Sequence, residues 1–307
     1  MILTYLHMIS GNIRICGCSY KLERSDSMIS GIDWESAINI RRSTRSFEIK
    51  PIELTKMNMI KSFIGDMKMP FEHNVKIKIF NASPDKKLYT IFSAPPDNMA
   101  FITDTDCCSL SAAGFVGEVA VLYATSIGLS TCWYGHYALA ELENVMPHLG
   151  EYKNLQNPKW GYGKGEVEGQ RAICITPLGY GNQNGVRLFD RMQQSLISYK
   201  RKPIENFLEG DMKADDLSPE ILYALDLARK APSAANSQHW RFLISSDRKT
   251  ISIAMPAGYK HIKWEHPDVD IGICASHLWL GLLMKNINCK VSLLEEEGRA
   301  VWQFHID

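Results

Sequence analysis

The sequence APSAANSQHWRF (residues 231–242) joins a helix-like segment to a strand-like one. Pro232 cannot continue a helix, and the small residues after it favour a turn before the strand HWRFLI (239–244). Small side chains on such a turn would let backbone approach a flat ring, and Ser233 and Asn236 could hydrogen-bond the ring's polar edge. A helix stop followed by a simple turn explains the same residues without a ligand.

A second informative stretch, RRSTR (41–45), lies far upstream. Three arginines this close would repel one another unless they were solvated or bridged by an anion, which planar guanidinium groups bind in a bidentate way. Ser43 would add a hydroxyl donor. The alternative is that Arg41, Arg42 and Arg45 complement the C-terminal end of a helix. The residues alone leave both interpretations open.

Charge and hydropathy exclude several classes of protein. The 307 residues contain 34 Lys plus Arg and 34 Asp plus Glu, so no overall field attracts nucleic acid or an anionic membrane. The most apolar window, 271–287, is shorter than a bilayer span and contains His277 and Lys285, which indicates a buried helix. The N-terminus lacks the basic region and the cleavage site of a signal peptide, so we expect a cytoplasmic protein.

The eight cysteines do not have the spacing of a disulfide framework or of a zinc ribbon. We therefore expect most of them to be small core residues. Cys16 and Cys18 form a C-x-C pair, but no second pair completes four ligands, so we predict no metal site. Residues 1–27 show no clear period and are interpreted as an N-terminal extension that need not be ordered.

Periodicity and capping residues predict the elements of the first half. They are a short helix capped by Asp33 or Ser36, a strand at 75–80, a long helix from about 111, a short strand at 131–134 and a buried strand at 171–181. Phe115, Val119 and Leu122 would share one face of the long helix, and Gly128 would end it.

The second half repeats this order. LTKMNMIKSFIG, VKIKIF and GFVGEVAVLYATSIGLST correspond to LSPEILYALDLA, WRFLIS and IGICASHLWLGLLMKNINC. Thr55 and Ser218 take equivalent cap positions (218 − 55 = 163), and Gly128 and Asn286 take equivalent helix exits (286 − 128 = 158). Both exit residues tolerate the left-handed conformation. Because any two α/β segments share such capping rules, order alone does not establish the repeat.

Five segments in order resemble the FMN-dependent nitroreductase family, over residues 33–292. RRSTRSF is similar to its R-R-S-x-R-x-F, APSAANSQHW to its A-P-S-x-x-N-x-Q-P-W, and SIGLSTCWYG to its G-L-G-x-x-W-x-G. ITPLGYG and KRKPIENFL are similar to its closing P-x-G-Y and R-K-P-(L/I)-E segments. One departure is His239, which replaces the family's proline and which we expect at the surface rather than in catalysis.

The resemblance implies an α+β, nitroreductase-like fold. The family forms homodimers that bind flavin at the interface, with arginines from one subunit and the small-residue loop from the other. Here the first half keeps the arginines and the second half keeps the loop. The resemblance therefore implies a pseudo-dimer of two tandem α/β halves, with sheets flanked by helices, at residues 28–208 and 209–307. It is similar to the fused, single-chain branch of the family, and we expect a monomer with one flavin site between its halves.

The resemblance also assigns cofactor-binding residues. The phosphate would be held by the basic segment and a later arginine, the flavin's reactive nitrogen would lie near a Tyr-Gly pair, and the loop would contact the ring. These residues are Arg41, Arg42, Ser43, Arg45, Arg201, Tyr134, Gly135, Pro232, Ser233, Ala234, Asn236 and Gln238. The alternatives that need no ligand are a basic linker at Arg201 and an ordinary strand end at Tyr134.

The implied function is an FMN-dependent NAD(P)H oxidoreductase with a ping-pong mechanism. NADH or NADPH would reduce FMN, and the flavin would reduce a nitroaromatic, a quinone or another flat small molecule. No side chain is required as a catalyst. The alternatives are a flavoenzyme of the same fold with another acceptor (a dehalogenase or flavin-cleaving enzyme), a non-catalytic flavin-binding or sensing protein, and a structural relic without flavin.

Overall fold

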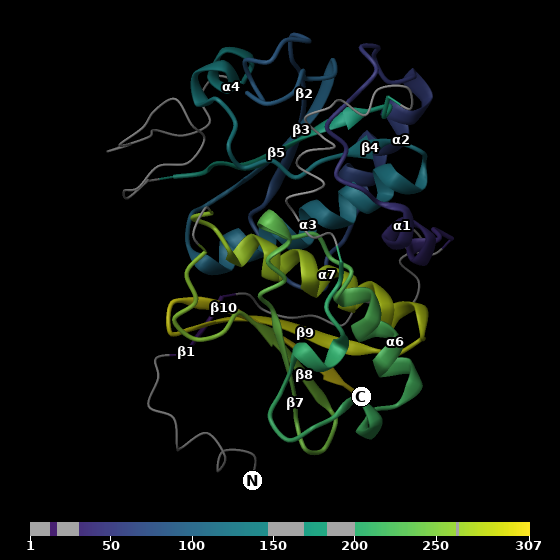
Figure 1. Ribbon diagram of the computed structural model, residues 1–307, viewed down its shortest axis with the longest axis vertical. Coiled ribbons are helices and arrows are strands. Elements are labelled where there is room, and N and C mark those ends of the chain that lie inside the picture. The colour runs from purple at the N-terminus through teal and green to yellow at the C-terminus, as the bar shows by residue number, and fades with distance from the viewer. Residues whose placement is uncertain (1–12, 17–30, 147–168, 183–199, 262–263) are drawn as a thin grey trace.

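The computed structural model describes residues 13–16, 31–146, 169–182, 200–261 and 264–307. Two helices, α3 (Cys107–Ser126) and α7 (Asp268–Met284), pack against each other in the middle of the molecule. One sheet lies on each side of this pair (Figure 1). The architecture is the α+β arrangement of two tandem halves that the sequence predicts.

The first half contributes a four-stranded antiparallel sheet in the order β2-β3-β5-β4. Its strands are β2 (Lys76–Asn81), β3 (Asp97–Thr103), β5 (Arg171–Gly179) and β4 (Ser130–Thr131). Its other helices are α1 (Trp34–Ile40), α2 (Leu54–Asp66) and α4 (Leu139–Val145). Strands β3 and β5 are buried along their whole length, which explains their continuous apolar runs.

The second half builds a six-stranded sheet in the order β1-β9-β10-β8-β7-β6, in which only β6 and β7 pair in parallel. The strands are β1 (Ile13–Ile15), β9 (Cys289–Glu296), β10 (Arg299–Ile306), β8 (Thr250–Ala254), β7 (Arg241–Ile244) and β6 (Leu208–Glu209). Helix α6 (Pro219–Ala228) and the short helices η1 (Ile204–Asn206), η2 (Ala214–Asp216) and η3 (Ala234–Asn236) complete it. Strand β6 straddles the expected boundary at 208/209 and joins the second-half sheet.

The N-terminal segment corrects two expectations. β1 pairs with the outer edge of β9, so residues 13–16 belong to the fold although it was expected to begin near residue 28. Cys16 forms a disulfide with Cys108, at the start of α3, although no disulfide spacing was recognised. Cys18 and the other residues of 1–27 lie outside the described residues. The free cysteines that the structure describes are Cys107, Cys132, Cys174, Cys274 and Cys289.

Helix α3 begins four residues earlier than expected and is buried on nearly all sides, not on one face. It lies between α7 and the sheets, so every face meets protein. Among the described residues, α3 is the helix long and apolar enough to cross a membrane, but 83% of its most apolar window is buried. This is the environment of a core helix.

The crossing of α3 and α7 supports the internal repeat. A Cβ atom added to Gly114 would meet the backbone of Val269 and Ile273, and one added to Gly272 would meet that of Ser111 and Phe115. The equivalent residues differ by 158 in each case (272 − 114, 269 − 111, 273 − 115), the same offset that relates the two helix exits. The crossing is therefore locally two-fold symmetric.

The predicted caps can be compared directly. Gly128 and Asn286 both leave their helices with positive φ (81° and 57°), as predicted. Ser218 caps α6 by accepting a hydrogen bond from the Ile221 amide. The prediction for Thr55 is wrong, because the N-cap of α2 is Glu53, which makes no side-chain cap hydrogen bond.

Candidate functional site

The basic segment 41–45, the small-residue loop 231–238 and the segment 131–135 all lie beside the α3–α7 pair. Arg41 and Trp133 contact Glu118 on α3, and the loop contacts Asp270 on α7. Asp33 caps α1 by accepting from the Ser36 amide, and the helix ends at Arg41, as predicted. The chain then runs extended alongside β4, because Ser43 bridges to Thr131 and the Thr44 amide donates to the Thr131 carbonyl. The basic segment 41–45 is thereby fixed next to the strand that leads to Tyr134.

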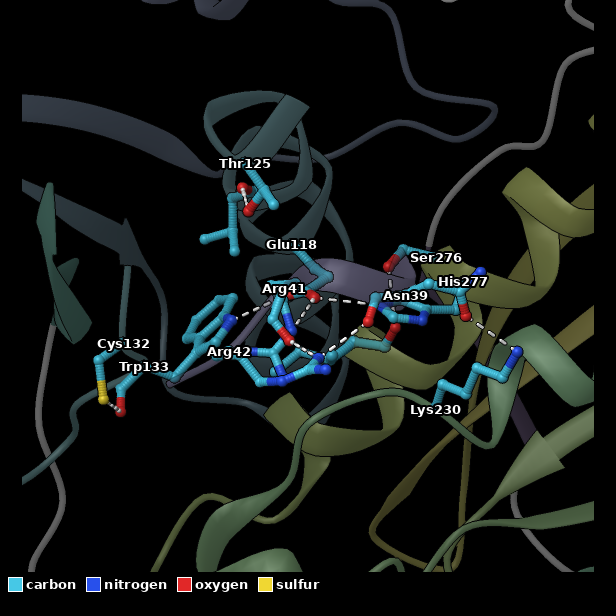
Figure 2. A network of polar contacts seen from close by, with 12 residues as sticks. Asn39, Arg41, Arg42, Glu118, Thr125, Cys132, Trp133, Lys230, Ser276 and His277 are labelled. Atoms are coloured by element: carbon cyan, nitrogen blue, oxygen red, sulfur yellow. Dashed lines mark hydrogen bonds and ion pairs between the residues drawn. The ribbon is translucent and has the colours of Figure 1, made fainter. Parts of the chain in front are cut away.

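Arg41 is a buried cation with unused hydrogen-bonding capacity. Its side chain is 6% exposed, and its Nε lies 3.7 Å from a carboxylate oxygen of Glu118 (Figure 2). Among the residues that the structure describes, Nε and Nη1 have no hydrogen-bond acceptor. Burial lowers the pKa of Arg41, and the negative charge of Glu118 opposes this effect. Such a guanidinium is suited to a further anion.

Arg201, which lies in the chain between β5 and η1, is a second cation of the site. Its guanidinium donates to the Asn236 side-chain oxygen and to the Lys230 carbonyl, at 2.8 Å for the latter. Burial and then the positive charge of Arg41 lower the pKa of Arg201 to about 10, so the two groups lie within electrostatic reach. The exposed Arg42, whose Nη1 donates to the Asn39 carbonyl, contributes in the same direction.

A buried polar network lies directly behind Arg41 (Figure 2). Glu118 on α3 is fully buried, and it accepts from Trp133 Nε1 at 2.6 Å and contacts His277 Nε2 on α7 at 3.0 Å. The other ring nitrogen of His277 lies 3.1 Å from the Leu227 carbonyl. Sequence reasoning missed Glu118 as a site residue. Its signal was an ionisable side chain inside an apolar helix, which requires a partner.

The small-residue loop, residues 231–238, adopts an unusual backbone. Ala235, Asn236 and Gln238 have positive φ values of 51°, 54° and 50°. Such conformations cost about 1 kcal/mol or more for residues other than glycine, and they persist where surrounding contacts impose them. Here the Gln238 amide donates to Ser233 Oγ, and the Ala234 amide donates to Asp270 on α7. The loop is held in a fixed, strained shape.

Gln238 holds the segment around Arg201 rather than facing outward. The Gln238 side chain is buried, donates to the Lys200 carbonyl at 3.0 Å and accepts from the Lys202 amide at 3.0 Å. Pro232, at the start of the loop, is also buried. Arg201 and the loop therefore form one hydrogen-bonded unit, which explains why both motifs occur together.

His239 was expected at the surface, and this expectation is wrong. The residue is 4% exposed and stacks on Tyr259 with ring centroids 4.4 Å apart. Its nitrogens contact Ser237 Oγ and the Pro267 carbonyl. Burial lowers the pKa of His239 to about 4, whereas burial raises that of the neighbouring Asp270 to about 8. Both side chains are therefore mainly uncharged near neutral pH.

The Tyr134–Gly135 pair closes the other side of the site. The amide and carbonyl of Tyr134 both bond to Ile175, at 2.9 and 3.0 Å, so its backbone is already used within the sheet. The Trp264 ring packs against the α-carbon of Gly135 so closely that an added Cβ would overlap it. Glycine is required here for this close approach. A flat ligand at Gly135 would have to share this space with the indole.

Electrostatic effects link several of the arginines predicted from the sequence. The positive charge of Arg41 lowers the pKa of Arg201, and the half-buried Arg45 is near enough to influence the pKa of Arg41. Within the described residues, no group of three or more His, Cys, Asp and Glu side chains could hold a metal. Guanidinium donors without acceptors, beside a strained loop of small residues, fit a phosphate with a flat ring attached.

The two tandem halves and their central helix pair form a nitroreductase-like fold. A family model described as "Putative TM nitroreductase" matches residues 33–147 and 152–282. The chain belongs to this family of oxidoreductases, and the two matched segments agree with the internal repeat.

One solved structure with a TM-score above 0.5 has the same fold. It is a protein described as a "putative nitroreductase" from Thermotoga maritima, 22% identical, with 90% of this chain and 94% of that chain covered and a TM-score of 0.54. A protein described as an FMN-dependent nitroreductase from Clostridium difficile R20291 is 16% identical, with 50% and 92% covered and a TM-score of 0.32. A nitroreductase family protein from Clostridium novyi NT is 16% identical, with 49% and 87% covered and a TM-score of 0.34. No match was found among curated proteins.

Proposed function

We propose that the chain binds one FMN between its halves and acts as an NAD(P)H-dependent oxidoreductase on flat acceptors such as nitroaromatics or quinones. The observation that carries this proposal is the buried guanidinium of Arg41, whose Nε and Nη1 have no hydrogen-bond acceptor among the described residues. Arg41 is within electrostatic reach of Arg201, which is hydrogen-bonded to Asn236 of the second-half loop. When bound, FMN would supply hydride acceptance from NADH or NADPH and electron transfer to the second substrate.

The protein's part is binding and orientation. Arg41 and Arg201 would hold the phosphate by charge-assisted hydrogen bonds, each contributing about 1.5 to 3 kcal/mol. Asp270 fixes the small-residue loop through the Ala234 amide, which keeps that backbone in place for the ring. Because Asp270 is mainly uncharged near neutral pH, it holds the loop without adding negative charge beneath it. No side chain of the site needs to transfer a proton.

A second candidate function, a flavin-binding protein without turnover, is favoured by one observation. Trp264 lies against Gly135, where the family resemblance places the flavin's reactive nitrogen. An indole fixed there would block the approach of a nicotinamide or an acceptor. The two functions differ in turnover and not in flavin content, so a kinetic experiment separates them.

The test is steady-state oxidation of NADH and of NADPH by the FMN-loaded protein, with a nitroaromatic and a quinone as acceptors. Wild-type protein should turn over, and Arg41→Ala should lose both retained FMN and activity. Arg248→Ala is the matched control, because Arg248 is an exposed arginine in the turn between β7 and β8. Bound FMN without any turnover would support the non-catalytic function, and no bound FMN would contradict both.

We further propose a cytoplasmic monomer, because the two halves can supply each other's interface. Light scattering would give one chain per particle if this is correct. The Cys16–Cys108 disulfide provides a test of compartment, since the cytosol keeps thiols reduced. Acid quenching of the cells, followed by alkylation of the denatured protein, should then label both cysteines, whereas protection of both would place the protein in an oxidising compartment.

A further inference from the structure

We propose that Glu118 is a positioning residue, which holds Arg41 for the cofactor phosphate through a network shared with His277 and Trp133. The inference rests on the proposed function, because it assigns Arg41 to a phosphate. It goes further in identifying the second half's helix α7 as the support for an arginine of the first half. The four residues Arg41, Glu118, Trp133 and His277 are called the Glu118 network below.

The donor pattern shows why a carboxylate is needed. Trp133 Nε1 donates to one oxygen of Glu118, and the other oxygen faces both His277 Nε2 at 3.0 Å and Arg41 Nε at 3.7 Å. The His277 ring lies between two oxygens, the Leu227 carbonyl at 3.1 Å from Nδ1 and Glu118 at 3.0 Å from Nε2. Of these neighbours, Trp133 Nε1 and the guanidinium of Arg41 can only donate, so both require an acceptor at the position of Glu118.

The geometry also leaves one edge of Arg41 available. The carboxylate of Glu118 attracts the Nε side of the guanidinium, while Nη1 is buried and has no acceptor among the described residues. The charges would then alternate from phosphate to Arg41 to Glu118, so that the buried guanidinium has an opposite charge on either side.

The internal repeat shows that packing does not require this network. With the offset of 158 found at the helix crossing, Glu118 corresponds to Ser276 and Val119 corresponds to His277 (276 − 118, 277 − 119). Ser276 donates only within its own helix, to the Ile273 carbonyl. The same crossing is therefore buried on its other side without an ion pair. The network occurs only on the side that contains Arg41.

The decisive variant is Glu118→Gln, assayed by the dissociation constants of FMN and of riboflavin, which lacks the phosphate. A glutamine can accept from Trp133 and donate its amide to a neutral His277, so the core keeps its hydrogen bonds while Arg41 loses its carboxylate. We expect the FMN dissociation constant to rise about tenfold, the equivalent of one charge-assisted contact, and that of riboflavin to change less than about twofold.

Two further variants make the result unambiguous. Ser276→Ala alters the symmetry-equivalent position and should leave both constants unchanged. Trp133→Phe removes one donor to Glu118 while retaining a ring to stack on Phe101, so it should weaken FMN selectively by about threefold. It also decides the question if Glu118→Gln does not fold.

The outcomes distinguish failure of the proposed flavin-binding function from failure of the positioning role of Glu118. Wild-type protein that binds neither flavin would overturn the proposed function itself. The positioning role would be overturned if wild type binds FMN but the Glu118 and Trp133 variants change the dissociation constants of FMN and riboflavin equally, or change neither. The proposed function would then still stand.

Discussion

The crossing of α3 and α7 gives the sharpest stability prediction, for Gly272→Ala. The new Cβ would lie 2.7 Å from the Ser111 carbonyl carbon and 2.8 Å from the Phe115 amide nitrogen, and closer still to the Ser111 carbonyl oxygen. Real Cβ atoms essentially never approach other atoms within 3.0 Å. The obstacles are backbone atoms of a buried helix, which cannot rotate aside, so the two helices must move apart.

The magnitude follows from two opposing effects. Overpacking of a core costs about 1 to 3 kcal/mol, and a clash with buried backbone belongs at or above the upper end of that range. Alanine offsets about 1 kcal/mol of this cost through its higher helix propensity. We therefore expect Gly272→Ala to lower the free energy of unfolding by about 2 to 4 kcal/mol. Because one separation of the helices relieves both clashes, adding Gly114→Ala should cost less than the sum of the single changes.

Urea unfolding, followed by circular dichroism, measures this effect. The control is Gly65→Ala near the end of α2, where an added Cβ has no neighbour within 4 Å. That variant should be unchanged or more stable by up to about 1 kcal/mol. A Gly272→Ala protein as stable as wild type, with an unchanged m-value, would refute the close crossing and with it the symmetry argument.

Three other perturbations have definite expected outcomes. Burial raises the pKa of Asp270 to about 8, so the stability that its protonated form contributes is lost as the pH rises. Between pH 6.5 and 8 the free energy of unfolding of wild type should fall by about 2 kcal/mol, and that of Asp270→Asn by less, as measured by denaturant titrations at each pH. In this window His239, with a pKa lowered to about 4, contributes only about 0.4 kcal/mol in the opposite direction. Cys16→Ser opens a disulfide spanning 92 residues and should cost up to about 4 kcal/mol, after which a reducing agent has no further effect on the urea midpoint. Ala235→Gly relieves a positive φ, so it should raise the free energy of unfolding by about 0.5 to 1 kcal/mol, which thermal unfolding would show as a higher melting temperature.

Local signals in the sequence predicted the elements well. Asp33, Ser218, Gly128 and Asn286 all act at helix ends as predicted, because capping depends on a few neighbouring residues. The segments RRSTR and APSAANSQHW were recognised as parts of one site because each carries its own turn or charge chemistry. The prediction for Thr55 failed because α2 begins at Leu54 after the N-cap Glu53, and Glu53 makes no side-chain cap hydrogen bond that the sequence could signal.

Long-range features could not be read in this way. Strand β1 has three residues, too few to show a period, and its disulfide joins residues 92 positions apart. Glu118 meets His277 across 159 positions, so neither residue signals the other. The positive φ of Ala235 is likewise imposed by the loop's tertiary contacts, since alanine itself disfavours that conformation. These features depend on how the halves pack.

The central claim is a single flavin site made by the two halves of one chain. The most direct measurement is a titration of the apoprotein with FMN, followed by quenching of flavin fluorescence, on protein whose mass per particle is known from light scattering. The account predicts saturation at one FMN per chain on a monomer. Saturation at two per chain, at one per two chains, or no binding at all would contradict it.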